Sequence, residues 1–184
     1  MNTRLLGVMM IVGSTLAALN NFRSDGTFDQ ISSIALIIWC ISVICGLIAM
    51  LRLNALGQNP VARAAVFLPI LGFATIIVSD TLRLAGIVPL GTPVNNALAA
   101  IGWIGILAGM LVVAILTIAA KTWTGWRRFA PLLTIVFIPL ALGVGSLIGD
   151  MKLSGAVAYL AFILLGVVIA TAEPAHELQP VVNA

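Results

Sequence analysis

The chain has 184 residues, of which 61% are hydrophobic and 8% are charged, and its mean hydropathy is +1.19. Soluble domains carry about 25% charged residues, so this composition excludes a soluble globular protein and indicates an integral membrane protein. The net charge is +3, but the nine Lys and Arg residues stand singly or in pairs beside apolar runs, which excludes the basic stripe of a nucleic-acid-binding protein.

A transmembrane helix needs about 20 apolar residues, so six helices with short loops use up almost the whole chain. The sequence therefore predicts an all-α integral membrane protein, a six-transmembrane-helix bundle. We expect one domain over residues 1–172 and an irregular tail over 173–184, with no room for a soluble domain.

The first three helices follow from apolar runs and their end signals. The first is expected over 5–19; an apolar run behind a cation also begins signal peptides, but no A-x-A cleavage site follows, so we expect it to be retained. The second is expected over 31–53. The third is expected over 60–88, because Asn59 and Pro60 provide an N-cap followed by proline at the first helical position.

The last three helices are expected over 96–120, 129–149 and 154–172. Between the first two of these lies a short segment in which tryptophans alternate with cations, a composition typical of the membrane–water interface. Its anchor residues are Lys121, Trp123, Trp126, Arg127 and Arg128.

Counting cations at alternate helix ends predicts the orientation. One side collects Arg4, Arg52, Arg63, Lys121, Arg127 and Arg128, and the other collects Arg23, Arg83 and Lys152. Because Lys and Arg concentrate on the cytoplasmic side, we expect both termini to be cytoplasmic, most simply in a plasma (inner) membrane.

One sequence pattern occurs twice. Pro69 is followed eleven residues later by Asp80 and then Arg83, and Pro139 is followed eleven residues later by Asp150 and then Lys152. Charges next to hydrocarbon are costly, so these two pairs are the candidate functional residues, as ion pairs or as the lining of an outer vestibule. Asp80 lies about 25 Å along the helix from Arg63, which predicts a position just inside the membrane boundary.

This repetition admits a parallel internal repeat of helices 2–3 and 4–5. Each helix expected to run inward also opens with small residues and an aromatic residue: residues 35–39, 99–103 and 158–162 end in Trp39, Trp103 and Phe162. We expect small residues four apart, such as Gly105 and Gly109, to pack helices closely, and Pro69 and Pro139 to kink their helices.

The sequence lacks the side chains that several kinds of metal, cofactor or catalytic site require. The sole histidine, His176, lies in the tail, Cys40 and Cys45 project from different faces of one helix, and Ser146 has no intramembrane base to activate it. We therefore predict no metal site and no cofactor, although a lipid, or a pigment or quinone that needs no histidine, remains compatible with the sequence.

Two functions stay open, with a third behind them. The first is a non-catalytic accessory or packing subunit of a larger membrane assembly, or a self-associating bundle. The alternative is a small permease or channel component whose outer vestibule contains the charge pairs. The third is a lipid-modifying membrane enzyme, for which the sequence offers little. The expected partners are membrane lipids and other membrane subunits or further copies of the chain, and not nucleic acid.

Overall fold

The computed structural model describes residues 2–23, 30–149 and 151–172, and every secondary-structure element in these ranges is helical. The elements are α1 (Thr3–Arg23), α2 (Gln30–Arg52), α3 (Pro60–Ala64), α4 (Phe67–Leu84), α5 (Pro93–Ala120), the 3-10 helix η1 (Gly125–Phe129), α6 (Ala130–Ile148) and α7 (Met151–Ala170). Five helical segments among the described residues are long and apolar enough to cross a membrane, and α7 adds a shorter apolar stretch over 155–170. The predicted all-α membrane bundle is confirmed.

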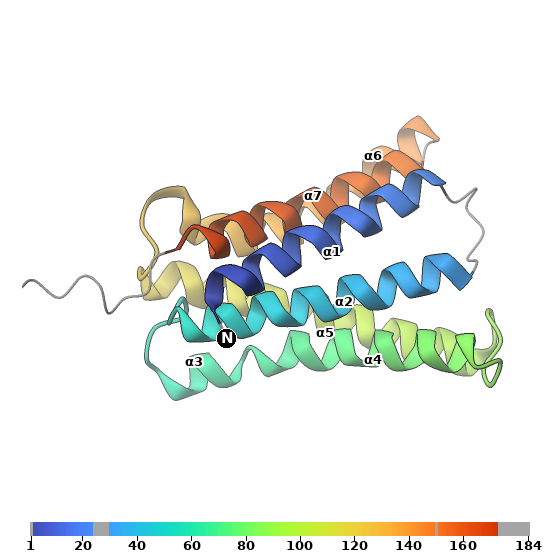
Figure 1. Cartoon of the computed structure of the whole chain (residues 1–184), viewed down its shortest axis with the longest axis horizontal. Helices are drawn as coiled ribbons and strands as arrows, with labels where there is room; N and C mark the ends of the chain where they lie inside the picture. Colours follow the sequence, from blue (N-terminus) through green and yellow to red (C-terminus); the bar gives the residue numbers. More distant parts are fainter. Residues whose placement is uncertain (1, 24–29, 150, 173–184) are drawn as a thin grey trace, which may run out of the picture.

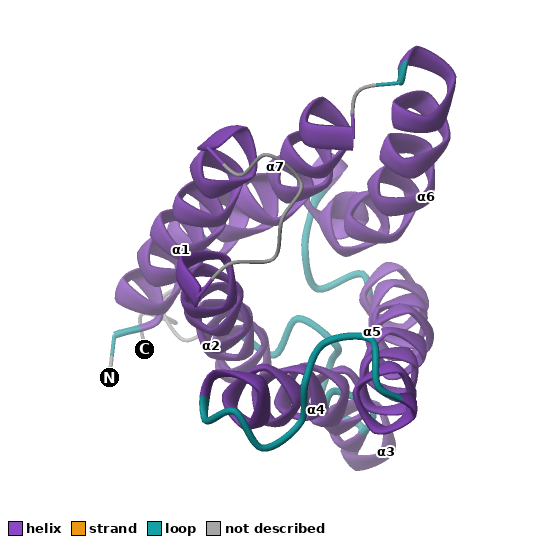
Figure 2. Ribbon diagram, turned by 90° about the vertical axis from the view of Figure 1, so that its right-hand side faces the viewer, coloured by secondary structure: helices purple, strands orange, loops and turns teal. Residues whose placement is uncertain are grey.

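The six long helices lie roughly side by side and close into a ring (Figures 1 and 2). Each packs against its neighbour along the chain, in the order α1, α2, α4, α5, α6 and α7, and α7 packs back against α1. Short connections make such neighbours adjacent. The ring places side chains from α2, α4, α5 and α7 around a common interior.

The segment expected to form one helix over 60–88 is interrupted. It forms α3 and α4, which are joined at Ala65 and Val66, and α4 ends at Leu84 rather than at Val88. Asn59 caps α3 as expected, because its side-chain oxygen accepts a hydrogen bond from the Val61 N–H at 2.9 Å. The sequence signal for the start of this segment was therefore correct, whereas its continuity was not.

The two matched prolines occupy different positions in their helices. Pro69 is the third residue of α4 and therefore lies in the first turn, where backbone N–H groups have no intrahelical acceptor, so the proline removes no hydrogen bond there. Pro139 lies inside α6, as expected. In place of a kink at Pro69 itself, the segment is interrupted at Ala65 and Val66, which immediately precede α4 and keep right-handed helical dihedral angles.

Small residues bring particular helices into close contact. A Cβ atom built on Gly72 of α4 would lie 2.6 Å from the backbone nitrogen of Ile106 and 2.8 Å from the carbonyl oxygen of Gly102, both on α5. A Cβ on Gly7 of α1 would lie 2.8 Å from the carbonyl oxygen of Gly166 on α7. Without water between helices, this close approach is what permits dispersion contacts to hold them together.

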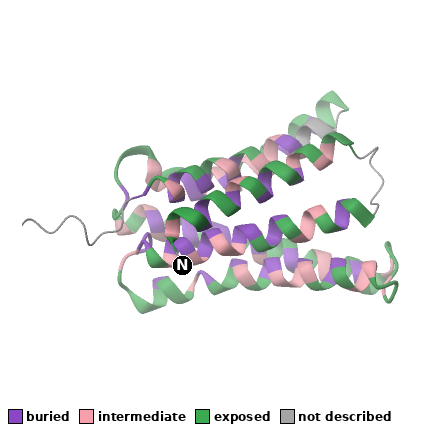
Figure 3. Cartoon of the chain, in the orientation of Figure 1, coloured by how far each residue is buried: buried purple, intermediate pink, exposed green. Residues whose placement is uncertain are grey.

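Whether a residue is buried depends on whether it faces the inside or the outside of the ring (Figure 3). The interior contains fully buried large side chains, among them Trp39, Phe73 and Phe162, while apolar side chains such as Leu71 and Ile104 point outward and are more than 60% exposed. A soluble bundle would place polar residues there, so the apolar outer surface fits contact with lipid.

Among the described residues, the side-chain hydrogen bonds that link different helices or loops lie at the two ends of the bundle. At one end, Thr122 donates a hydrogen bond to the Ala55 carbonyl at 2.7 Å, which ties the α5–η1 connection to the α2–α3 connection. Arg127 Nη1 donates to the Thr171 carbonyl at 3.5 Å at the same end. The opposite end, where α4 ends (Figure 1), contains Arg83 in the last turn of that helix together with its partners.

Candidate functional site

Asp80 and Arg83 meet on one face of α4. Arg83 Nη2 lies 2.7 Å from Asp80 Oδ1, and each side chain is 11% exposed. Residues three apart on a helix are neighbours, so the spacing alone permits this contact. Both groups are removed from solvent, and a charge in that position needs its partner to remain stable.

A third residue completes this arrangement from another helix. Arg83 Nη2 donates a hydrogen bond to Ser33 Oγ of α2, and the Ser33 hydroxyl also hydrogen-bonds to the Asp80 carboxyl group. Ser33 is itself buried. The acid, the base and the hydroxyl therefore satisfy one another and join α2 to α4. The sequence pattern singled out Asp80 and Arg83 but not Ser33, because only tertiary packing brings residue 33 next to residue 83.

Further polar contacts lie at the same end of the bundle. Ser79 of α4 donates to Asn95 Oδ1 of α5 at 3.3 Å, and Asn20 of α1 donates to Ser32 Oγ of α2 at 3.2 Å. These side chains link four helices in succession. We call this set the polar layer: Asn20, Ser32, Ser33, Ser79, Asp80, Arg83 and Asn95.

The second predicted charge pair cannot be placed in the same way. Asp150 and the side chain of Lys152 lie outside the described residues. The backbone shows that α6 ends at Ile148 and that α7 begins at Met151, so a helix boundary separates positions 150 and 152. Side chains two residues apart can meet only across such a boundary, and the pairing of Asp150 with Lys152 stays a prediction.

The predicted anchor segment lies at the opposite end from the polar layer. Lys121 caps α5 in a left-handed conformation with φ of 54°. Trp126 is 57% exposed, but Trp123 is only 8% exposed and belongs to the buried core, so the two tryptophans do not share one environment. The Arg128 guanidinium lies 4.8 Å from the centre of the Phe129 ring, a cation–π contact.

An aromatic cluster fills the interior of the ring and forms the second candidate site. The Trp39 ring packs edge-on against Phe73 of α4, Tyr159 and Phe162, with ring centres 5.1 to 5.4 Å apart. Its centre lies 6.2 Å from that of Trp103 on α5. Aromatic pairs favour such tilted and edge-to-face contacts.

This cluster gives a structural meaning to a pattern noted in the sequence. Trp39, Trp103 and Phe162 each close the small-residue stretch of a helix expected to run inward, and the structure brings all three to the same interior. The sequence alone suggested a repeat and no site, because apolar letters do not reveal which helix faces meet.

The comparisons with known proteins add no relative. The chain matches no family model, no curated protein and no solved structure. The polar layer and the aromatic cluster are therefore the features from which a function can be inferred.

Proposed function

We propose that the protein is a non-catalytic accessory or packing subunit of a larger membrane assembly, or a bundle that associates with copies of itself. The observation that carries this proposal is the mutual satisfaction of Asp80, Arg83 and Ser33 inside the bundle. These groups bind one another and join α2 to α4, as ion pairs that hold helices together do. They are therefore best explained as structural.

The hydroxyl groups deeper in the helices also favour this proposal over a permease for polar solutes. Thr75, Thr117 and Thr134 each donate to a carbonyl oxygen of their own helix, at 2.6 to 2.9 Å. Ser146 does the same towards the Gly143 carbonyl at 2.8 Å. A hydroxyl used in this way is less able to replace the hydration shell of a passing solute, and a polar pathway requires such replacement.

For the orientation, we propose that the end formed by the α2–α3 and α5–η1 connections is cytoplasmic in a plasma (inner) membrane. Arg52, Arg63, Lys121, Arg127 and Arg128 belong to this end. The excess of cations over the other end supports this direction of insertion. Both termini would then be cytoplasmic.

The test is the mass of the native particle. The tagged protein would be extracted with its surrounding lipid by a styrene–maleic acid polymer, and the particle's protein content would be measured by native mass spectrometry. We expect at least one further chain in fixed proportion to the 19.2 kDa protein, either a different membrane protein or a second copy. Particles that contain a single copy and no other protein would contradict the proposal.

A variant separates this proposal from the permease alternative. Asp80→Asn combined with Arg83→Ala removes both charges and leaves neutral groups beside Ser33. An accessory subunit should keep its partner in this variant as long as the bundle stays folded. Loss of a transport activity in the folded double variant, with the particle's composition unchanged, would instead support a permease.

A further inference from the structure

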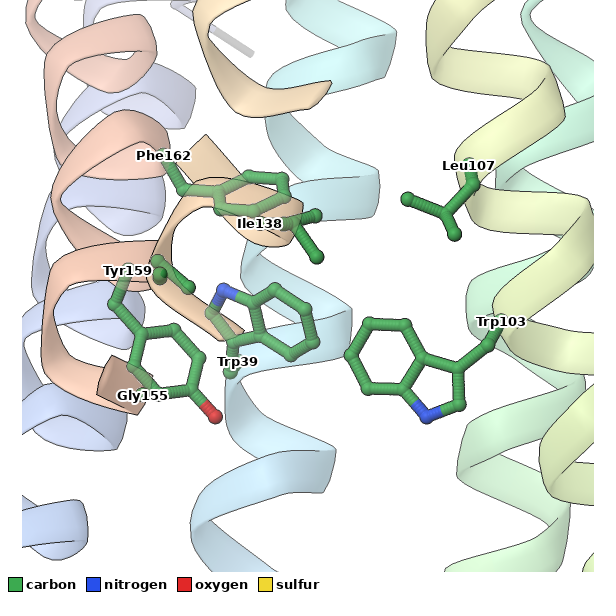
Figure 4. A pocket seen from close by; sticks show the side chains of 9 residues that line it. Trp39, Trp103, Leu107, Ile138, Gly155, Tyr159 and Phe162 are labelled. Carbon is green, nitrogen blue, oxygen red and sulfur yellow. The ribbon is translucent and has the colours of Figure 1, made fainter. Parts of the chain in front are cut away.

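A cavity of about 450 Å³ lies in the interior of the ring, beside the aromatic cluster (Figure 4). Four helices provide its walls: α2, α5, α6 and α7. Its lining residues are Trp39, Trp103, Leu107, Ile138, Ala141, Gly155, Ala158, Tyr159 and Phe162. Sites for small molecules in proteins typically enclose about 300 to 1,000 Å³ and are lined mainly by hydrophobic and aromatic side chains.

The ring of helices explains why space remains at this place. Trp39 and Phe73 fill the side of the interior between α2 and α4. Elsewhere in the cavity wall, α6 and α7 contribute the small residues Ala141, Gly155 and Ala158. The cavity therefore has aromatic side chains from α2, α5 and α7 around it and small residues of α6 and α7 between them, which leaves room for a ring.

Polar atoms are placed at one end of this cavity. Figure 4 shows the Tyr159 hydroxyl and the indole nitrogen of Trp103 at the end where Gly155 lies, while Phe162, Ile138 and Leu107 lie towards the other end. Among the described residues, neither donor group has a hydrogen-bond partner. The polar end is also the one nearer the polar layer, because Gly155 lies against Asn21 of α1.

The indole nitrogen of Trp39, unlike these two donors, is fully buried without a hydrogen-bond partner in the described part of the chain. The rings of Tyr159 and Phe162 stand at 81° and 90° to the Trp39 plane, so an aromatic face can accept its N–H weakly. Trp103 is 37% exposed and Tyr159 is only partly buried, so both donors are accessible to a bound acceptor, which would give each a hydrogen-bond partner.

We propose that this cavity binds a planar ring compound of the quinone class, with a carbonyl oxygen towards Tyr159 and Trp103 and its apolar part towards Phe162 and Leu107. The aromatic walls suit edge and face contacts with the ring. The two donors match carbonyl acceptors, whereas a lipid acyl chain would leave them unpaired. This site is additional to the accessory role proposed above and does not depend on it.

The test uses purified protein in lipid nanodiscs and 2-methyl-1,4-naphthoquinone as the probe. Quinones quench indole fluorescence, so Trp39 and Trp103 report occupancy, and Trp126→Phe removes the most exposed tryptophan from the signal. We expect quenching that saturates at one molecule per chain. Quenching that grows in proportion to the probe, as collision in the lipid phase does, would overturn the proposal.

Two substitutions locate the site. Ala158→Leu extends a side chain into the cavity and should abolish the saturable component, whereas Ala100→Leu, on an exposed face of α5, should leave it unchanged. Tyr159→Phe removes one donor and keeps the ring, so the dissociation constant should rise about fivefold, the effect of losing one ordinary hydrogen bond.

Thermal melting of each variant verifies that it is folded, and Tyr159→Phe decides the outcome if Ala158→Leu unfolds. Unchanged affinity in Tyr159→Phe would overturn the proposal, as would equal saturable binding in Ala158→Leu and Ala100→Leu. Displacement of a co-purified phospholipid by Ala158→Leu, with no saturable quinone binding in the unsubstituted protein, would assign the cavity to an acyl chain and overturn it too.

Discussion

Replacing Arg83 with alanine tests whether the polar layer holds the bundle together. The change leaves the Asp80 carboxylate without its cation and removes the hydrogen bond from Arg83 to Ser33. Removal of one partner from a buried ion pair costs about 3 to 5 kcal/mol. Since each side chain keeps 11% of its exposure, we expect the lower end, about 3 kcal/mol. For a chain of this size that corresponds to a melting temperature lower by about 6 to 12 °C.

The double variant tests whether the loss of stability in Arg83→Ala comes from the uncompensated Asp80 charge. Asp80→Asn combined with Arg83→Ala leaves no uncompensated charge, so it should recover part of the loss caused by Arg83→Ala alone. Arg63→Ala is the matched control, because Arg63 is exposed on α3, and it should change stability by less than about 0.5 kcal/mol. Lys152→Ala should also cost less than Arg83→Ala, as expected for an exposed pair.

Melting in detergent can be followed by helical circular dichroism and by a thiol-reactive dye. In a Cys45→Ala background the dye reports on Cys40, which is free and 0% exposed in the folded protein. Equal losses of stability in Arg83→Ala and Arg63→Ala, with no recovery in the double variant, would refute the reasoning. They would show that the contact with Arg83 does not stabilise the buried Asp80 carboxylate.

Three further predictions follow from packing, topology and composition. Gly72→Ala should destabilise the bundle by about 1 to 3 kcal/mol because its Cβ collides with the α5 backbone, whereas Gly143→Ala, with open space around it, should be neutral or slightly stabilising; melting temperatures in detergent compare them. In a background without cysteines, an impermeant thiol reagent on intact cells should label a cysteine at Thr27 and not at Thr124; the opposite pattern would invert the orientation. The isolated chain should contain no haem or stoichiometric transition metal by absorption spectroscopy and elemental analysis, and a stoichiometric haem spectrum would contradict this.

Much of the fold could be predicted because its causes are local along the chain. The length of each apolar run determines whether it can cross a membrane, and Asn59 before Pro60 marks a helix start wherever the rest of the chain lies. The contact between Asp80 and Arg83 also depends only on helical spacing, so the sequence could propose it.

The break before α4 was missed for a physical reason. Pro69 permits either a kinked continuous helix or a new helix that starts just before it, since a proline is tolerated in the first turn. The tight approach of Gly72 to Gly102 on α5 accompanies the second arrangement. That approach involves residues distant in sequence, and hydrophobic patterning contains no information about it.

The composition by itself determined that the protein is a membrane bundle. A soluble chain of this size with so few charged residues could not remove so many apolar residues from water. Only the tertiary structure decided that Ser33 joins the Asp80–Arg83 pair, and that Trp39 and Trp103 meet beside a cavity. In a membrane helix nearly every face is apolar, so the sequence does not mark which face turns inward. The closure of the ring determines which helix faces turn inward, and it thereby brings together the residues of the two candidate sites.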